Sequence, residues 1–327
     1  MKFNSIFYTI PGRRHLSMGK GNEDFVNVYE SDTVLVYAVA DGCSESTCAA
    51  PASEATAAGI EFATNGDIWD MKQKAIRDEY LRILDKHYLA CPYPYEDLAA
   101  TTVLLIINKA SGKYLAISIG DCSCIILNHA LEPALLLQPL NLLRQKDRTV
   151  FANSSLASRS MRMEMGSMDG VGGFVLISDG ADALIDQEHI PDLQQLTSLT
   201  VLSPKQAQSE LQTYVGKLSE TTSDDITVAI TMCCDDPELI KIAGATYDSE
   251  LILEDETDTA PQTEECILQL DDTDDNESLL EFLKTPRTAE ELVIAGYVNA
   301  ETVILTVLTP YLKDNLIKYE DHHFSTV

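Results

Sequence analysis

The stretch from Val34 to Gly42 constrains the fold most, because it is an almost unbroken apolar run that ends in an acid and a glycine. A continuous apolar run of strand length, rich in β-branched residues and bounded by turn residues, is typical of a buried strand. A carboxylate at the end of such a strand is costly unless a metal ion or a basic group meets it. The sequence therefore predicts that Asp41 is held rigidly beside a positive charge.

Acids stand beside several other expected strands, and these are Glu23, Asp24, Asp121, Asp179 and Asp224. A single Asp-Gly pair is usually only a turn, but turns alone do not readily account for acids at the ends of so many strands. Carboxylate and carbonyl oxygens without His or Cys suit Mg²⁺ or Mn²⁺. Two such ions about 3.5–4 Å apart can activate a shared water for attack on phosphorus.

The rest of the first two thirds of the chain alternates strand-like and helix-like segments. A second helix after the Ala-rich one is expected over about 67–89, where apolar residues keep 3–4 spacing. A further helix is expected over 203–218, with Pro204 in its first turn. Residues 129–170 are less regular. The expected strands are 3–10, 25–29, 34–41, 101–108, 113–119, 124–128, 174–178 and 226–232, and the expected helices end near 64, 89 and 218.

Net charge excludes some classes of function. The formal charge of the chain is −29, which disfavours binding to nucleic acid or to an anionic membrane surface. No apolar run approaches the roughly 18 residues of a membrane helix. Cysteines without structural-zinc spacing indicate reduced thiols, so we expect a cytoplasmic protein.

The C-terminal third changes character after residue 234. Residues 235–275 are acidic and lack sustained periodicity, which predicts a linker. Residues 276–327 are expected to form a small winged-helix-like module, with three helices and a two-stranded wing at 316–324. Its few basic residues favour contact with a protein partner, or self-association, over a DNA-binding regulator.

Six short motifs in one order carry a family resemblance. The chain resembles the type 2C protein phosphatases, which are metal-dependent Ser/Thr phosphatases, over about residues 1–233, and the segment 12–24 resembles a bacterial branch. The motifs are Asn22-Glu23-Asp24, Val39-Ala40-Asp41-Gly42, Ala100-Thr101-Thr102, Ile119-Gly120-Asp121, Ser178-Asp179-Gly180 and Ser223-Asp224-Asp225-Ile226-Thr227-Val228.

This resemblance implies an α+β fold, a four-layer α-β-β-α sandwich of two antiparallel sheets, with the winged-helix-like module added. The implied domains are a catalytic domain at 1–234, an acidic linker at 235–275 and the module at 276–327.

It also implies two Mn²⁺ or Mg²⁺ ions and possibly a third. By resemblance, Asp41 bridges the two metals and the Gly42 carbonyl binds the first of them. Asp179 and Asp224 bind the second metal, and Glu23 and Asp24 hold metal-bound waters. Asp121, together with Asp179, binds the third metal.

Some positions depart from the family pattern. Many members have an Arg where this chain has Gly19, and that Arg grips the substrate phosphate. Lys20, Arg14 or Arg13 are the candidates to replace it, although Lys lacks the bidentate fork of Arg. The basic turn that contains Arg13 and Arg14 is also compatible with a solvated surface loop. Asp225 stands where Asn is common.

Two hypotheses about function follow. The first is hydrolysis of phosphoserine and phosphothreonine on a signalling phosphoprotein by a metal-bridged hydroxide, with Asp41, Lys20 and Arg14 as catalytic candidates. The alternative is a non-catalytic scaffold that uses the same fold to bind a partner. Metal titration combined with a phosphatase assay separates the two.

Overall fold

The protein is described from a computed structural model, which covers residues 1–43, 50–64, 68–137, 149–253, 287–288, 317–320 and 323–326. The chain divides into two compact units. The first comprises Met1–Leu140 and Thr149–Ile252, and the second comprises Asn141–Arg148 and Leu253–Val327. The first unit contains every residue expected at the metal site.

Two five-stranded antiparallel sheets form the centre of the first unit. One sheet has the order β1-β10-β9-β6-β7 and the other has the order β2-β3-β4-β5-β8. Their strands are β1 (Phe3–Ile10), β2 (Phe25–Glu30), β3 (Val34–Gly42), β4 (Ala100–Asn108), β5 (Lys113–Ile119), β6 (Ser123–Asn128), β7 (Pro133–Leu137), β8 (Arg162–Ser167), β9 (Val171–Ile177) and β10 (Ile226–Cys233).

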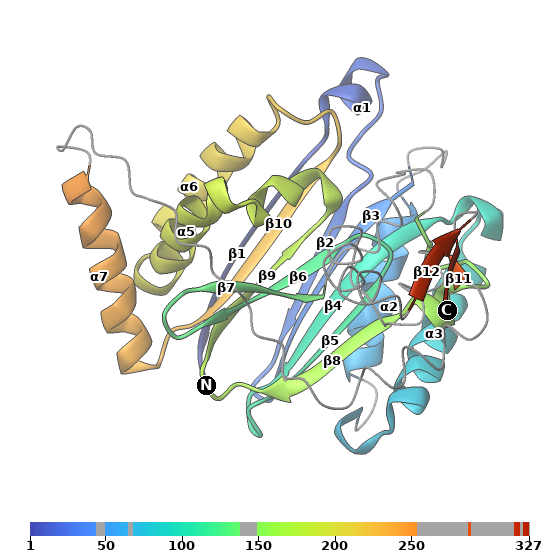
Figure 1. Cartoon of the computed structure of the whole chain (residues 1–327), viewed down its shortest axis with the longest axis horizontal. Coiled ribbons are helices and arrows are strands. Elements are labelled where there is room, and N and C mark those ends of the chain that lie inside the picture. Colours follow the sequence, from blue (N-terminus) through green and yellow to red (C-terminus); the bar gives the residue numbers. More distant parts are fainter. Residues whose placement is uncertain are drawn as a thin grey trace. The chain divides into compact units, whose positions relative to one another are not determined.

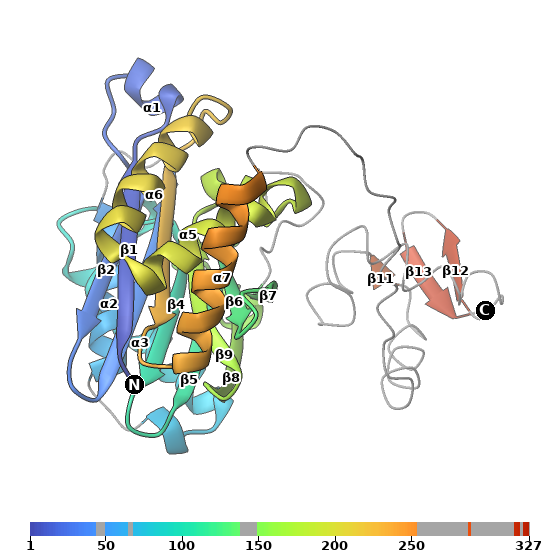
Figure 2. The same ribbon diagram turned by 90° about the vertical axis from the view of Figure 1, so that its left-hand side faces the viewer.

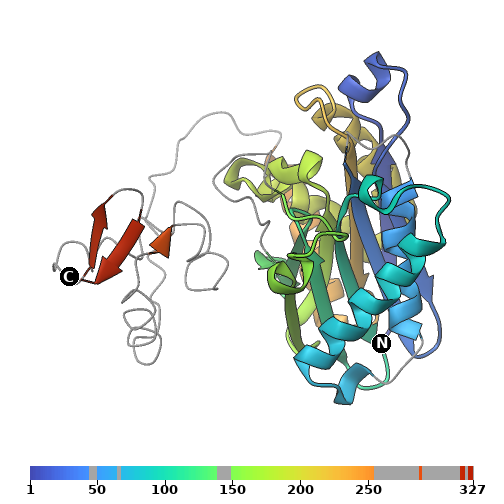
Figure 3. The same ribbon diagram turned by 90° about the vertical axis from the view of Figure 1, so that its right-hand side faces the viewer.

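Helices cover the outer face of each sheet, as Figure 1 shows. Figure 2 is turned toward the layer of α5, α6 and α7, and Figure 3 toward the layer of α2 and α3. The helices are α1 (Arg13–Ser17), α2 (Ala50–Thr64), α3 (Gln73–Ala90), α4 (Ala157–Ser160), α5 (Ile190–Leu202), α6 (Pro204–Leu218) and α7 (Pro237–Leu253), with short 3₁₀ turns at Ile68–Asp70, Tyr95–Asp97, Asp179–Ile185 and Gln187–His189. The expected four-layer α-β-β-α sandwich is confirmed.

Strand β3 shows why its sequence is apolar throughout. Leu35, Tyr37 and Val39 point into the core between the two sheets. Val36 and Ala38 point the other way, into the core beneath α2 and α3. Because successive side chains of a strand face opposite sides, a strand covered on both faces must be apolar at every position.

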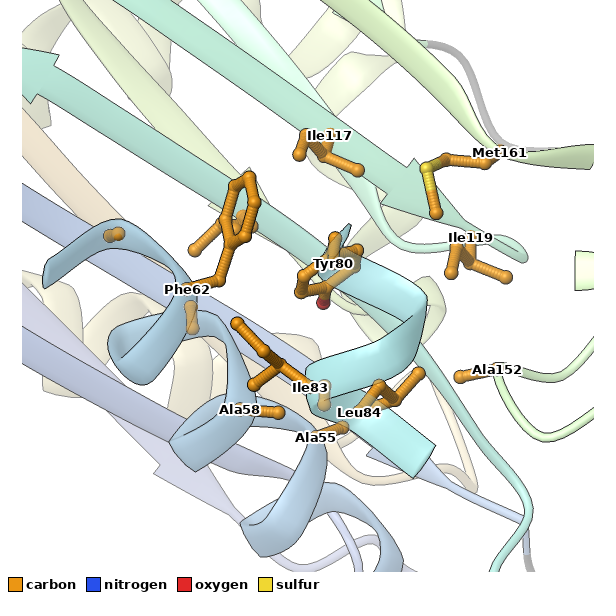
Figure 4. Packing of buried hydrophobic residues seen from close by; sticks show 14 of the residues in the cluster. Ala55, Ala58, Phe62, Tyr80, Ile83, Leu84, Ile117, Ile119, Ala152 and Met161 are labelled. Carbon is orange, nitrogen blue, oxygen red and sulfur yellow. The ribbon is translucent and has the colours of Figure 1, made fainter. Parts of the chain in front are cut away.

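The helical layers are held by apolar side chains of matched size. Figure 4 shows Phe62 of α2 beside Tyr80 of α3, and their rings meet edge to face at 5.3 Å. Ala55 and Ala58 of α2 let the two helices and the sheet approach closely. On the other side, α5, α6 and the start of α7 close a second core over β1, β9 and β10.

Helices α1, α4 and α5 were not expected from the sequence, and the structure also differs from the expectation in the two segments 235–275 and 129–170. Helix α7 occupies the first part of the segment 235–275, where a linker is expected, because Leu239 and Ala243 are spaced four apart and both are buried against the sheet. The abundant acids of this segment obscure that spacing. The segment 129–170 contains strands β7 and β8, each of which forms the edge of a sheet.

The described part of the second unit is a three-stranded antiparallel sheet in the order β11-β13-β12. Its strands are β11 (Arg287–Thr288), β12 (Ile317–Glu320) and β13 (His323–Thr326). The pair β12–β13 falls where the two-stranded wing is expected. The three helices expected in 276–327 lie outside the described residues. Among the described helices, none combines the length and the apolar character that crossing a membrane requires.

Candidate active site

Strand register brings the predicted acids to one end of the sandwich. Asp41 pairs with Thr101, and the neighbouring Thr102 pairs with Ile119, two residues before Asp121. Phe25, which follows Asp24, pairs with Ala40. In the other sheet Ile177 pairs with both Ser123 and Val228, which places Asp179 and Asp224 at the same end of their sheet.

Two glycines permit the tight backbone contacts at this end. A Cβ on Gly42 would lie 2.8 Å from the carbonyl oxygen of Glu23, and the Gly42 N–H donates to that oxygen at 3.2 Å. A Cβ on Gly180 would lie only 1.9 Å from the carbonyl oxygen of Asp225. The Asp-Gly motifs therefore need glycine because another backbone segment occupies the space of a side chain.

The acids strongly affect one another. Burial raises the pKa of Asp24 to about 7, although the hydrogen bond that Ser178 donates to its Oδ2 at 2.7 Å opposes the shift. Desolvation, followed by repulsion from Asp24, Asp179 and Asp121, raises the pKa of Asp41 well above its ordinary value. Asp41, Asp24, Asp179 and Asp121 therefore form one electrostatic cluster, called the acid cluster below.

Three carboxylate oxygens of this region are buried and accept no hydrogen bond, and they are Glu23 Oε2, Asp24 Oδ1 and Asp121 Oδ1. Buried polar atoms are normally paired, so each of these requires an explanation. A divalent cation and its waters would satisfy them, and an all-oxygen donor set fits Mg²⁺ or Mn²⁺. The residues present therefore fit the expected metals.

The acids do not form a closed cage. In the part of the chain that the structure describes, no three His, Cys, Asp or Glu side chains are arranged so that they alone hold a metal ion. Mg²⁺ keeps several waters and takes few protein ligands, so an open arrangement with unpaired oxygens suits it better than a closed one.

The predicted metal ligands come from different loops and strand ends at this end of the sandwich, and they differ in how deeply they are buried. Glu23 and Asp24 are buried in the loop before β2, and Asp121 is buried in the turn after β5. Asp41 and Asp179 are half-buried, and the charges of Asp24, Asp179 and Asp121 raise the pKa of Asp41. Asp224 lies in the loop before β10, where its Oδ1 accepts the N–H of Asp225 at 3.2 Å.

The basic candidates separate into three environments. Lys20 is half-buried, and its Nζ lies 3.0 Å from Oε1 of Glu23, one of the predicted site acids. Arg13 donates from Nη2 to the carbonyl oxygen of Glu220 at 2.6 Å, so it holds a neighbouring loop. Arg14 is exposed on α1.

The structure adds residues that the sequence alone did not single out. Thr149 donates to Asp121 Oδ2 at 2.7 Å. Arg162 donates from Nη2 to the carbonyl oxygen of Gly120 at 2.9 Å, and burial lowers its pKa to about 10 while the charge of Asp121 opposes that shift. Both come from the segment 129–170, whose irregular pattern gave no local signal of a role.

The fold and the acid cluster define a class of protein with a carboxylate-lined site at one end of a four-layer sandwich. The sequence model of protein phosphatase 2C matches residues 11–216, so the chain belongs to the protein phosphatase 2C family. None of the proteins with curated functions matches the sequence significantly.

Solved structures share the fold at low sequence identity. The Ser/Thr phosphatase Stp1 from Staphylococcus aureus is 12% identical with a TM-score of 0.52, over 71% of this chain and 96% of that one. A bacterial serine phosphatase is 12% identical with a TM-score of 0.51, over 71% and 98%. A C. elegans sex determining protein is 15% identical with a TM-score of 0.52, over 74% and 68%.

Proposed function

We propose that this protein is a metal-dependent protein phosphatase that hydrolyses phosphoserine and phosphothreonine, with Mn²⁺ or Mg²⁺ held by the acids at the end of the sandwich. One observation carries the proposal: buried carboxylate oxygens of Glu23, Asp24 and Asp121 have no hydrogen-bond partner, beside an Asp41 whose pKa is raised. Family membership supports the same reaction.

The family resemblance supports a role for each of these residues. Asp41, the Gly42 carbonyl, Asp179 and Asp224 are the proposed direct ligands. Glu23 and Asp24 are proposed to hold metal-bound waters, and Asp121 is proposed to serve a looser third ion together with Asp179. Bound divalent cations would supply activation of the attacking water and neutralisation of the phosphoryl oxygens.

The basic residues have a separate proposed role. Of the candidates Arg13, Arg14 and Lys20, Lys20 is the best placed to add a positive charge, because it already contacts Glu23. Arg14 is the second candidate, because its exposed side chain is available to a substrate that approaches α1. A phosphate dianion beside so many carboxylates needs positive charge in addition to the metals.

A phosphothreonine peptide tests this proposal. Wild-type protein with Mn²⁺ should release inorganic phosphate, EDTA should stop the release, and Asp41→Asn should abolish it while the protein stays folded by circular dichroism. Phosphate release that is equal in wild type and Asp41→Asn would refute the assignment of the site.

A second candidate function is a non-catalytic scaffold. The observation that favours it is that two of the three basic candidates are already engaged, Arg13 with a backbone carbonyl and Lys20 with Glu23. A scaffold would bind no metal pair, or would bind metal without turnover. Calorimetric titration with Mn²⁺ beside the peptide assay therefore separates scaffold from enzyme.

The remaining organisation is also a proposal. We place the catalytic domain at 1–234, with α7 packed on it, and assign residues 276–327 to contact with a protein partner or to self-association. The described sheet β11-β13-β12 supports a folded element in that region. We propose a cytoplasmic phosphoprotein of a signalling system as the substrate.

A further inference from the structure

His15 is buried in an unusual place. It lies on the short helix α1, where the neighbouring Arg14 and Leu16 are exposed, yet only 1% of its own surface is accessible. Figure 1 shows α1 beyond the strand ends of the sandwich. A buried imidazole needs polar partners, because an unpaired polar group in the interior costs free energy.

Both ring nitrogens of His15 face carboxylates. Nδ1 lies 2.8 Å from Oδ1 of Asp225, and Nε2 lies 3.3 Å from Oε2 of Glu23. Glu23 and Asp225 are themselves at most 5% exposed. His15 thus links an acid of the loop before β10 to an acid of the loop before β2.

Asp225 is well supplied with donors even without His15. Its Oδ1 also accepts the N–H of Gly12 at 2.6 Å, and its Oδ2 accepts the N–H of Glu23 at 2.5 Å. Asp225 therefore fixes the backbone of Glu23. The distinct contribution of His15 is its second nitrogen, which is directed at the side chain of Glu23.

The Glu23 carboxylate has a basic side chain beside each of its oxygens. Lys20 lies at Oε1, and His15 lies at Oε2, which accepts no hydrogen bond. The Glu23 carbonyl accepts the N–H of Gly42, so the same residue is also tied to the end of the strand that carries Asp41. A change in the Glu23 rotamer would break the contacts of its carboxylate with both Lys20 and His15.

We propose that His15 is a positioning residue that fixes the Glu23 carboxylate for divalent-cation binding. This inference rests on the proposed function, because the cations are those proposed above. Side chains that orient the groups around a metal site typically change its affinity or activity by about 10–100-fold when they are mutated.

Two conservative substitutions of His15 test whether it positions Glu23 or only supports helix α1. The amide of Asn can occupy the place of Nδ1, so His15→Asn keeps the bond to Asp225 and loses the contact with Glu23. The amide of Gln can occupy the place of Nε2, so His15→Gln keeps the contact with Glu23. The measurement is calorimetric titration of each full-length protein with Mn²⁺ in the absence of substrate.

We expect His15→Asn to bind Mn²⁺ about 10–100-fold more weakly than wild type, and His15→Gln to bind close to wild type. The matched control is His87→Asn, because His87 also lies between two carboxylates, Glu54 and Glu61, but on the outer helices α2 and α3. It should leave the Mn²⁺ affinity unchanged.

The inference is overturned if His15→Asn binds Mn²⁺ as wild type does, or if the Asn and Gln variants are weakened equally. It is likewise overturned if only His15→Gln loses affinity, since the role of His15 would then be its bond to Asp225. Wild-type protein that binds Mn²⁺ but releases no phosphate would instead refute the proposed function and leave the binding comparison intact.

Discussion

Ser178 and Asp24 are joined by a hydrogen bond of 2.7 Å across the sandwich, from the end of β9 to the loop before β2. The Ser178 hydroxyl also accepts the N–H of Thr227 at 3.0 Å, and Ser178 is fully buried. One hydroxyl thus fixes the orientation of an acid of the cluster and joins the two sheets at their shared end.

Replacement of Ser178 should be costly for this reason. Ser178→Ala leaves the Thr227 N–H and Asp24 Oδ2 without their partner, so we expect a loss of about 1–3 kcal/mol in the free energy of unfolding. The control is Ser198→Ala, because the Ser198 hydroxyl is buried without a hydrogen bond and its removal should be neutral or stabilising. Urea unfolding of both variants measures this, and an equal loss in both would contradict the assigned role.

Stability of the metal-free protein should depend on pH through Asp24. Folding raises the pKa of Asp24 from 3.8 to about 7, so the folded state binds a proton more tightly than the unfolded state does. The stabilisation is complete below the lower value and is lost as pH rises through the upper one. Thermal unfolding in EDTA should show this decline between pH 4 and pH 7, and the decline should be smaller in Asp24→Asn. A slope that is identical in the two proteins would refute the assignment to Asp24.

Metal addition should reverse that decline. Cations bind the ionised carboxylates, so the rise in melting temperature caused by Mn²⁺ should be larger at pH 7.5 than at pH 5. Differential scanning fluorimetry at the two pH values measures the difference. A rise that is the same at both values would mean that ionisation of the cluster is not linked to cation binding.

Gly180 should tolerate no side chain. The Cβ of Gly180→Ala would collide with the Asp225 carbonyl oxygen, so the loop before β10 must shift. We expect destabilisation by about 1–3 kcal/mol, as for other overpacked sites. Gly216→Ala in α6 is the control, because nothing lies within 4 Å of its Cβ, and it should stabilise by about 0.5–1 kcal/mol. Chemical denaturation that ranks the two variants in the opposite order would contradict the close approach.

Removal of the region beyond α7 should spare the chemistry. A protein truncated after residue 253 keeps both sheets and all the predicted metal ligands, so hydrolysis of p-nitrophenyl phosphate should be nearly unchanged. Oligomeric state by light scattering, or partner binding, should change instead. Loss of turnover in a truncated protein that still binds Mn²⁺ would place residues beyond 253 in the catalytic machinery.

The apolar pattern predicted the central strands well because they are covered on both faces, whereas the four-layer sandwich was expected from the family resemblance. The unbroken apolar run of β3 and the acid that follows it are consequences of that burial, so strand and site residue are predicted together. The edge strands β7 and β8 lack this signal. Apart from Leu137, their residues are exposed or half-buried, so their patterns are weak.

The contacts among the site residues were harder to predict. The bond between His15 and Asp225 joins positions 210 residues apart, and no local spacing encodes it. Arg162 and Thr149 act on Asp121 from a segment without a recognisable period. Helix α7 was obscured by the acids around it, although Leu239 and Ala243 keep helical spacing. The local sequence pattern thus predicts helices and strands. The contacts of the site residues depend instead on how segments far apart in the chain pack together.

The central claim is that the acids at the end of the sandwich hold the metals that drive phosphate hydrolysis. The most direct measurement is turnover of p-nitrophenyl phosphate by wild type and Asp179→Asn, each with and without Mn²⁺. We expect Mn²⁺-dependent turnover in wild type, and turnover at the metal-free background in a folded Asp179→Asn protein. Wild-type activity that does not depend on Mn²⁺, or that Asp179→Asn retains in full, would contradict the claim.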